Sequence, residues 1–153
     1  MIKISKNTED TKKIAKDFLA ELYPRSDKAT VVGLYGELGV GKTTFTQAIA
    51  KELKIKRKVN SPTYVIIKNY ELKINNFKKL FHIDAYRLKN EKELIHLGWN
   101  EIISNKEHLI FIEWPENVIK ALPKKHHQIH ISHLSTGQAG IKRGYRNFKI
   151  KNT

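Results

Sequence analysis

The stretch Thr30-Val-Val-Gly-Leu-Tyr-Gly-Glu-Leu-Gly-Val-Gly-Lys-Thr43 decides the fold of this 153-residue chain. Its first part, Thr30 to Tyr35, is an apolar run rich in β-branched side chains and bounded by Gly36, which is typical of a buried strand in a parallel sheet. A helix is expected directly afterwards, because apolar side chains recur every four residues from Lys42 to Leu53. The predicted order is therefore strand, glycine-rich turn, helix.

The turn itself carries a motif of phosphate chemistry. Residues 36–43 fit the pattern G-x-x-x-x-G-K-[ST] at every fixed position. The glycines let backbone N–H groups point inward around a β-phosphate, Lys42 reaches the β and γ oxygens, and the Thr43 hydroxyl is a ligand for Mg²⁺. A plain glycine turn with an exposed lysine is disfavoured, because the motif follows a strand and opens a helix. The dinucleotide pattern G-x-G-x-x-G is not present, which disfavours NAD and FAD.

Two carboxylates close predicted strands elsewhere in the chain. Glu113 ends the apolar run that starts at Leu109, and Asp84 ends the run LFHID. The carboxyl ends of parallel strands lie beside the phosphate loop, where a short acid sits near the metal. A surface acid at a strand end is the alternative, and for Asp84 the two interpretations stay balanced.

The remaining sequence predicts one α/β domain over residues 1–153, with a mixed, mainly parallel central sheet flanked by helices. The other expected elements are a helix from the Asn7/Asp10 capping box to a point before Pro24, β-rich stretches at Thr63–Leu72 and Phe77–Asp84, a short helix between Asn90 and Gly98, and two strands after Pro123.

Composition narrows the class of protein. Hydrophobic residues make up 40% and charged residues 29% of the chain, which is typical of a soluble globular protein. The absence of cysteine excludes disulfide scaffolds, thiolate zinc sites and cysteine nucleophiles, and agrees with a reducing compartment. The apolar runs are too short to cross a bilayer, and no export signal is visible. We therefore expect a cytoplasmic protein that makes no membrane contact.

Four segments together resemble a known family. They are GELGVGKTT (36–44), SPTY (61–64), HIDAYRL (82–88) and IEWPE (112–116). In this order and in so short a chain, they are similar to the bacterial TsaE (YjeE) ATPases, which serve threonylcarbamoyladenosine modification of tRNA. The similarity extends from the first helix to the final strands.

The resemblance implies site residues, position by position. It implies ATP binding by Thr11, Glu37, Leu38, Gly39, Val40, Gly41, Lys42, Thr43 and Thr44. It implies Mg²⁺ at Thr43 and Glu113, and catalytic roles for Lys42, Asp84 and Glu113, with the choice between Asp84 and Glu113 as the group that orients water left open. It implies a switch or partner-facing role for Ser61, Pro62, Thr63, Tyr64 and Trp114. Tyr64, Glu37 and Ala85 depart from the usual family residues, and none of them removes a phosphate or metal ligand.

The function that the resemblance implies is a Mg²⁺-dependent ATP hydrolase, weak alone and stimulated by a partner. Its partner is the TsaB–TsaD heterodimer, which modifies adenosine 37 of tRNA. A small-molecule kinase is the first alternative, but the chain has few arginines and no arginine-rich lid. A non-catalytic RNA-binding module that merely holds nucleotide is the second.

Charge adds a hypothesis about where a partner docks. The 29 Lys and Arg against 15 Asp and Glu give a net charge of +14. Residues 1–60, 61–120 and 121–153 contribute +6, +1 and +7, and the last part contains no acid. This basic C-terminal part is where contact with tRNA or an acidic partner is sought.

Each of three further sequence features has two interpretations. Arg146 is a nucleotide-side or RNA-side cation. The histidines at positions 126, 127, 130 and 133 fit a polar strand face better than a metal site. The basic run Lys54–Lys58 is an RNA contact or a solvated helix end.

Overall fold

The computed structural model describes residues 1–56, 66–73, 76–135 and 141–153. Its elements in chain order are β1 (Ile2–Ser5), α1 (Thr8–Ala20), β2 (Thr30–Tyr35), α2 (Lys42–Glu52), β3 (Ile67–Glu71), β4 (Lys79–Asp84), α3 (Glu91–His96), α4 (Trp99–Ser104), β5 (His108–Glu113), the 3₁₀ helix η1 (Pro115–Ala121), β6 (His127–Ser135) and β7 (Ile141–Lys151).

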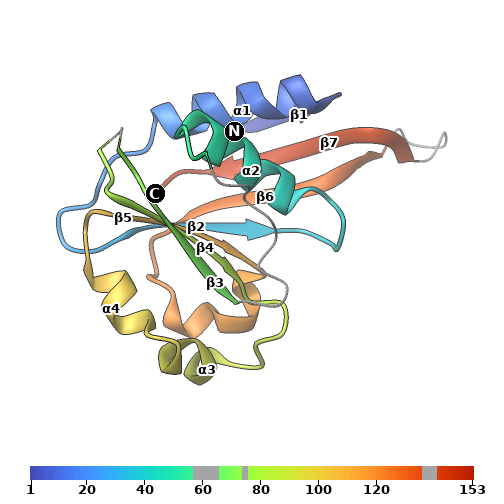
Figure 1. Cartoon of the computed structure of the whole chain (residues 1–153). Helices are drawn as coiled ribbons and strands as arrows, with labels where there is room; N and C mark the ends of the chain where they lie inside the picture. The colour runs from blue at the N-terminus through green and yellow to red at the C-terminus, as the bar shows by residue number, and fades with distance from the viewer. Residues whose placement is uncertain (57–65, 74–75, 136–140) are drawn as a thin grey trace.

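The strands form one sheet in the order β1-β7-β6-β2-β5-β4-β3 (Figure 1). The pairs β6/β2, β2/β5 and β5/β4 are parallel, whereas β1/β7, β7/β6 and β4/β3 are antiparallel. The mixed sheet with a parallel centre is confirmed. Its parallel strands β2, β5 and β4 all end at the same edge, which is the edge that the glycine-rich turn leaves.

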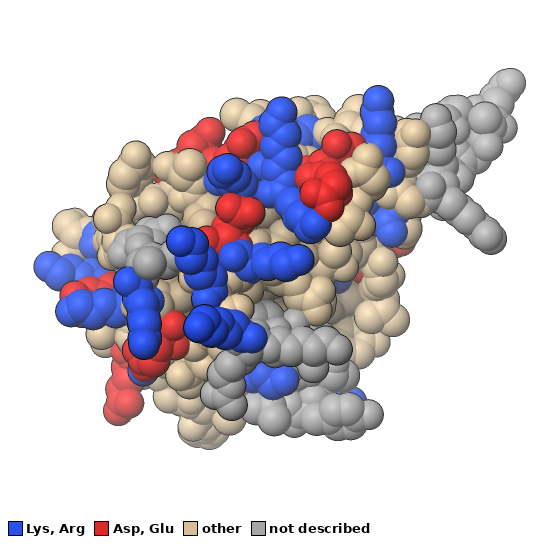
Figure 2. All heavy atoms as spheres, turned by 45° about the horizontal axis from the view of Figure 1, so that its top comes forward, with Lys and Arg blue, Asp and Glu red and all other residues tan. Residues whose placement is uncertain are grey.

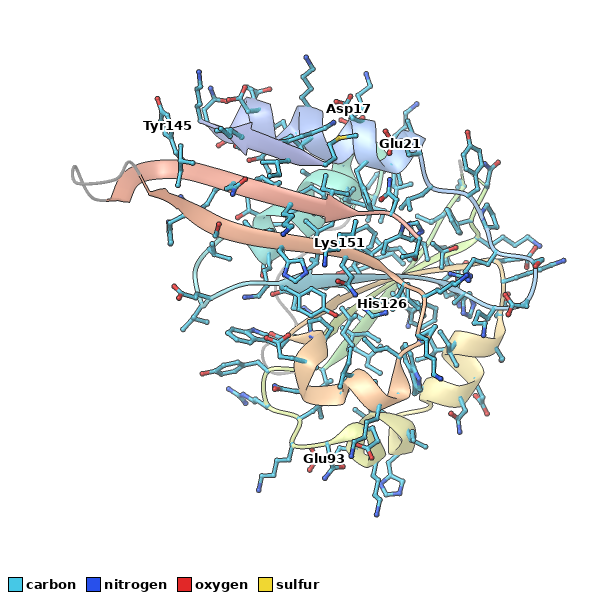
Figure 3. All side chains as sticks on the ribbon, turned by 180° about the vertical axis from the view of Figure 1, so that it is seen from behind. Asp17, Glu21, Glu93, His126, Tyr145 and Lys151 are labelled. Carbon is cyan, nitrogen blue, oxygen red and sulfur yellow. The ribbon has the colours of Figure 1, made fainter. Side chains whose placement is uncertain are left out.

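Helices cover the two faces of the sheet unequally. On one face α1 and α2 contribute Phe18 and Phe45, which pack against Phe111 of β5 and Phe148 of β7. On the other face α3, α4 and η1 build a second core around Trp99, with residues from β2, β4 and β5. Among the described residues, this second core includes none from β1, β6 or β7. The antiparallel half of the sheet is therefore covered on one face only (Figure 3).

Side-chain caps fix where the helices begin. The Asn7 side chain accepts from the Asp10 backbone N–H at 2.9 Å, and the Asp10 carboxylate accepts from the Lys6 N–H at 2.8 Å. This reciprocal pair confirms the predicted start of α1. Asn90 caps α3 in the same way, accepting from the N–H groups of the first turn. Within the described residues, no helix combines the length and the apolarity needed to cross a membrane.

Three short elements did not emerge from the sequence pattern. They are β1, α4 and η1, of 4, 6 and 7 residues. Gly98, at φ +90°, ends α3 and at the same time opens α4, so the predicted stop at this glycine is also a start. Elements this short do not repeat an apolar period often enough to be recognised.

Candidate functional site

The turn between β2 and α2 has a backbone that its glycines make possible. Gly36, Gly39 and Gly41 have φ values of +141°, +74° and +113°. A Cβ on Gly36 would lie 2.3 Å from the carbonyl oxygen of Ile131, so this position excludes any larger residue. Gly41 precedes the first turn of α2, and the N–H groups of that turn point toward the loop. The predicted phosphate-loop conformation is confirmed by these dihedral angles.

Lys42 lies beneath the loop with its ammonium group fully engaged. Its side chain is 4% exposed, and Nζ donates to the carbonyl oxygens of Gly36 at 2.5 Å and of Glu37 at 2.9 Å. The Trp114 ring lies over the same ammonium, 3.9 Å from Nζ to the ring centroid. Burial lowers the pKa of Lys42, while the negative charge of Glu113 acts in the opposite direction. The Lys42 ammonium group is thus held between the carbonyl groups of the loop and the Trp114 ring.

Thr43, Glu113 and His82 form one hydrogen-bonded group. The Thr43 hydroxyl donates to Oε1 of Glu113 at 2.9 Å, and Nε2 of His82 lies 2.8 Å from the same oxygen. Glu113 is 4% exposed and His82 is fully buried. Because a carboxylate oxygen only accepts, His82 donates through Nε2. Its Nδ1 is buried and has no partner among the described residues. The two predicted metal residues are therefore in contact.

Asp84 lies beside this group. It stands directly opposite Glu113 in the pairing of β4 with β5, and its Oδ1 accepts from the backbone N–H of Tyr86 at 2.9 Å. Thr43, Asp84 and Glu113 line a cavity of about 250 Å³ together with Lys42. Hydroxyl and carboxylate oxygens are the donors that Mg²⁺ prefers, so the residues present fit this ion.

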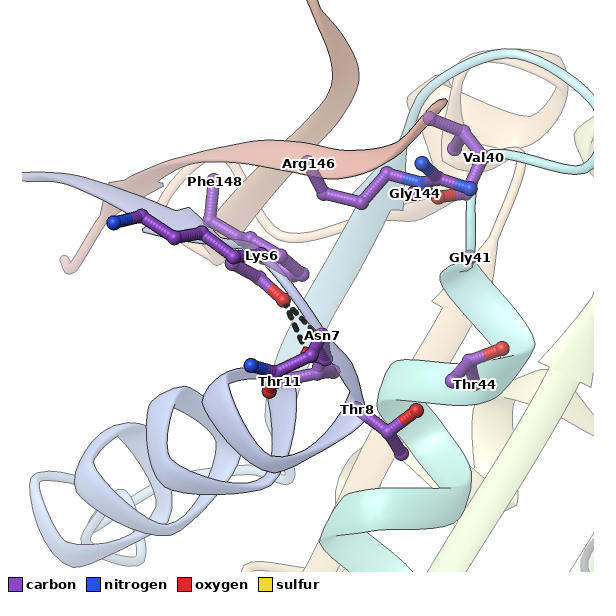
Figure 4. A pocket seen from close by; sticks show the side chains of 11 residues that line it. Lys6, Asn7, Thr8, Thr11, Val40, Gly41, Thr44, Gly144, Arg146 and Phe148 are labelled. Carbon is purple, nitrogen blue, oxygen red and sulfur yellow. Dashed lines mark hydrogen bonds between the residues drawn. The ribbon is translucent and has the colours of Figure 1, made fainter. Parts of the chain in front are cut away.

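A second cavity of about 250 Å³ lies on the other side of the loop (Figure 4). It is lined by the start of α1, by β7 and by Gly41 and Thr44, which also line the first cavity. Thr11 is buried in its wall, with its hydroxyl 2.7 Å from that of Ser5. The two hollows meet at the first turn of α2, where Gly41 and Thr44 line both of them.

Arg146 connects β7 to the loop. Its Nε donates to the carbonyl oxygen of Val40 at 2.7 Å, and the side chain lines the second cavity (Figure 4). Of the two alternatives left by the sequence, the structure places this cation on the loop side. The contact also ties the tip of the loop to a strand far away in sequence.

Trp114 follows Glu113 in an unusual backbone conformation. Its φ and ψ angles of 57° and 47° are left-handed, which is uncommon for a residue other than glycine, and Pro115 follows it. Its ring lies 5.0 Å from that of Tyr86, centroid to centroid. Strain of this kind concentrates at functional sites, and here it holds the indole over Lys42.

The remaining predicted site residues lie either at the loop or outside the described residues. Glu37 contributes a backbone carbonyl to Lys42, and Leu38 is exposed at the loop. The predicted switch segment, residues 61–64, lies outside the described residues. The residues of the second cavity that sequence reasoning missed are Ser5, Lys6, Asn7, Thr8, Gly144 and Phe148. The Asn7 cap was a usable signal, since it marks a helix N-terminus near the loop.

The histidines after Pro123 do not form a metal site in the part of the chain that the structure describes, where no cluster of three or more His, Asp or Glu suited to a metal is found. His126 Nε2 lies 2.9 Å from the Tyr35 hydroxyl, and the His130 ring stacks on that of Tyr35 at 4.5 Å between centroids. His127, in contrast, is buried on the other side of the sheet, where its ring lies 6.1 Å from that of Phe18, centroid to centroid, so the expected single polar strand face is wrong.

Comparison with known proteins identifies the family. The family profile described as "Threonylcarbamoyl adenosine biosynthesis protein TsaE" matches residues 5–142. The chain is 40% identical over 135 residues to the tRNA threonylcarbamoyladenosine biosynthesis protein TsaE of Bacillus subtilis, which covers 88% of this chain and 79% of that protein. It is 39% identical over 120 residues to the protein of the same name from Rickettsia felis, covering 78% of this chain and 64% of that protein.

A solved structure agrees. The crystal structure of Bacillus subtilis YdiB is similar with a TM-score of 0.74 and 30% sequence identity, covering 98% of this chain and 83% of that one. The phosphate loop, with its buried lysine and adjoining carboxylates, thus lies in a chain that is similar to TsaE proteins in both sequence and fold. The chain belongs to the TsaE family, whose role lies in tRNA threonylcarbamoyladenosine biosynthesis.

Proposed function

We propose that this chain is a Mg²⁺-dependent ATP hydrolase that acts in formation of threonylcarbamoyladenosine at position 37 of tRNA. The observation that carries the proposal is the Thr43–Glu113 hydrogen bond at 2.9 Å, beside a buried Lys42 and directly after a glycine loop. Adenosine phosphates bind with the phosphates on the loop and the nucleoside in the hollow at Thr11 and Thr44.

Each residue has a role in the proposed reaction. The loop N–H groups and Lys42 bind the phosphate oxygens and stabilise the negative charge that develops as the γ-phosphoryl group is transferred. Thr43 and Glu113 hold Mg²⁺, which when bound neutralises part of the charge on the β and γ oxygens. Asp84, next to Glu113 and facing the same cavity, is placed to orient the attacking water. Trp114 covers the lysine and keeps bulk water from it.

The proposal includes weak hydrolysis by the isolated chain. Among the described residues that line the cavity of Lys42 and Glu113, there is no arginine. An arginine at the transferred phosphate contributes about 10³-fold or more to hydrolysis in related P-loop enzymes. Leu38 and Tyr86, large exposed side chains at this opening, support docking of a partner there. The proposed partner is the TsaB–TsaD heterodimer in the cytoplasm, with tRNA contacted through the basic C-terminal part.

Phosphate release from ATP, followed with and without the TsaB–TsaD heterodimer, tests the proposal. We expect slow release alone, faster release with the heterodimer, and loss of both in Lys42→Ala. Equal rates with and without the heterodimer would contradict the partner assignment. Hydrolysis that survives in Lys42→Ala would contradict the assignment of the loop as the catalytic site.

A further inference from the structure

The uncovered face of β6, β7 and β1 is a surface that the proposed site does not use. Figure 3 views the molecule from the side opposite to Figure 1, so that this face points toward the viewer. No helix lies in front of the long β6–β7 pair in this view. The second core, built by α3, α4 and η1, includes residues of β2 but none of β6, β7 or β1 among the described residues. The side chains of these three strands on this face therefore have no helix packed over them. An open sheet face of this kind is available to a partner.

The register of the strands places four side chains in one row across this face. Ile2 of β1 pairs with Lys149 of β7, Lys149 with His130 of β6, and His130 with Tyr35 of β2. Residues directly opposite each other in a sheet share a face. We call Ile2, Lys149, His130 and Tyr35 the cross-strand row. It runs from the exposed edge of the sheet to the residue that precedes Gly36 of the phosphate loop.

Residues next to the cross-strand row are also exposed apolar or basic side chains. Ile4, two residues along β1, is 49% exposed, and Ile2 is 66% exposed. Lys151 lies two residues from Lys149 and shares its face. The two lysines are exposed, and neither has an ion pair among the described residues. The surface thus combines unpaired cations with exposed apolar side chains.

Acidic groups are scarce here. Among the described residues, Glu116 of η1 is the carboxylate that acts on Tyr35 and His130, while Lys149 and Lys151 act on His130 with the opposite sign. The chain after Leu122 contains no Asp or Glu at all. The positive potential of β7 is therefore not neutralised by its own segment.

The helical side of the molecule is different. Figure 2 shows Lys and Arg side chains interspersed with Asp and Glu over the face that comes forward there. On α1 these charges form ion pairs, Lys12 with Glu9 and, from β1, Lys3 with Asp17. A polyanion is attracted less to a face of mixed charge than to one of a single sign.

We propose that the open face of β6, β7 and β1 is a docking surface for tRNA, with Lys149 and Lys151 on backbone phosphates. The choice of RNA rests on the proposed function. Charge complementarity favours it over a protein, because lysine is depleted in protein interfaces whereas protein–nucleic acid interfaces are strongly basic. The exposed isoleucines contact sugars and bases at the edge of the sheet. The cross-strand row then links bound RNA to the phosphate loop through Tyr35.

Fluorescence anisotropy of a labelled, unmodified tRNA transcript tests the proposal over a range of salt concentrations. We expect wild type to bind with an affinity that falls steeply as salt rises. The double variant Lys149→Glu/Lys151→Glu should bind about 10-fold more weakly at low salt, and its log–log salt slope should be shallower by about 1 to 2. The matched control is Lys13→Glu/Lys16→Glu, which makes the same charge change at exposed positions of α1.

The outcomes separate the alternatives. Loss of affinity in the β7 variant with near wild-type affinity in the α1 variant supports the proposal. Equal losses in both variants would show an effect of net charge alone and overturn it, as would wild type that does not bind tRNA. A β7 variant that keeps tRNA affinity but no longer binds the TsaB–TsaD heterodimer would make this face a protein interface, which also overturns it.

Failure of this inference is distinguishable from failure of the proposed function. Lys149 and Lys151 line neither loop cavity, so ATP hydrolysis by the isolated β7 variant should equal that of wild type. Conversely, Lys42→Ala should bind tRNA like wild type while hydrolysis is lost.

Discussion

The two halves of the sheet differ in how their faces are covered. The parallel half, β2, β5 and β4, is buried on both faces, with residues such as Leu109 to Ile112 fully buried. The antiparallel half, β6, β7 and β1, which joins β2 through the parallel β6/β2 pair, has helices on one face only. Fully covered strands hold the carboxylates and the loop rigidly at one edge, whereas half-covered strands present a surface.

The difference in helix coverage matches how precisely side chains must be positioned in each half. Glu113 and Asp84 end adjacent strands that are packed on both sides, so Glu113 stays in contact with Thr43 and Asp84 stays opposite Glu113. The open half has no such requirement, because long lysine side chains adapt to a partner. Arg146 joins the two halves through its contact with Val40. The following substitutions test this division.

The largest effect is expected at the end of the parallel half. Glu113→Gln keeps the size of the side chain but removes the charge, so Mg²⁺ is held poorly and ATP hydrolysis should fall about 100-fold or more. Single-turnover phosphate release measures this. Glu116→Gln is the matched control, since Glu116 is an exposed acid nearby. Comparable loss in both variants would show that general negative charge, and not the ligand position, matters.

Burial on both faces is tested by a pair of isoleucines. Ile112 of β5 is fully buried, whereas Ile4 of β1 is 49% exposed. Ile112→Ala should lower the free energy of unfolding by about 2–5 kcal/mol, and Ile4→Ala by less than about 1 kcal/mol. Urea unfolding followed by circular dichroism gives both values. Similar losses at the two positions would mean that the halves do not differ in packing.

His82 tests whether packing beneath the site positions Glu113. His82→Leu removes the donor to Oε1, and the Mg²⁺ concentration for half-maximal tightening of ATP binding should rise about 10-fold or more. His82→Gln, whose amide nitrogen reaches the same place, should restore much of this. Calorimetry with and without Mg²⁺ separates the metal effect from nucleotide affinity. If metal-free affinity falls as much in His82→Leu, the residue supports the fold and not the ligand.

The smallest effect is expected in the antiparallel half and depends on pH. Burial lowers the pKa of His127 and of His130 below the ordinary 6.5. Below pH 6.5 the unfolded chain therefore binds protons that the folded chain does not, and stability falls as the pH is lowered. In the variant His127→Gln/His130→Gln, the unfolding midpoint should decrease less between pH 7.5 and 5.5. An unchanged decrease would exclude these two groups as its cause.

The sequence alone predicted the parallel half better than the antiparallel half. The boundaries of β2 and the conformation of its loop follow from local chemistry, since positive φ values require glycine and a continuous apolar run requires burial on both faces. The contact of Glu113 with Thr43 followed from strand ends meeting at one edge. In contrast, β1 is a short edge strand whose pairing with β7 is formed by residues nearly the whole chain apart.

Part of the second hollow was missed for the same physical reason, although Thr11, Gly41 and Thr44, which line it, were among the predicted residues. Its walls come from the start of α1 and from β7, two segments that only tertiary pairing brings to the loop. A local sequence pattern indicates a helix cap, as at Asn7, but it does not indicate which cavity or segment the capped end of the helix faces. Arg146 likewise has no local signal, because its hydrogen bond to Val40 spans 106 positions.

Calorimetric titration of ATP into the protein, with and without Mg²⁺, tests the central claim most directly. That claim is that the two hollows on either side of Gly41 and Thr44 are one Mg²⁺–ATP site. Wild type should bind one ATP per chain, more tightly with Mg²⁺, and Thr43→Val should lose the gain from Mg²⁺ while metal-free binding persists. Absence of ATP binding, or a Mg²⁺ effect that Thr43→Val leaves intact, would contradict the account.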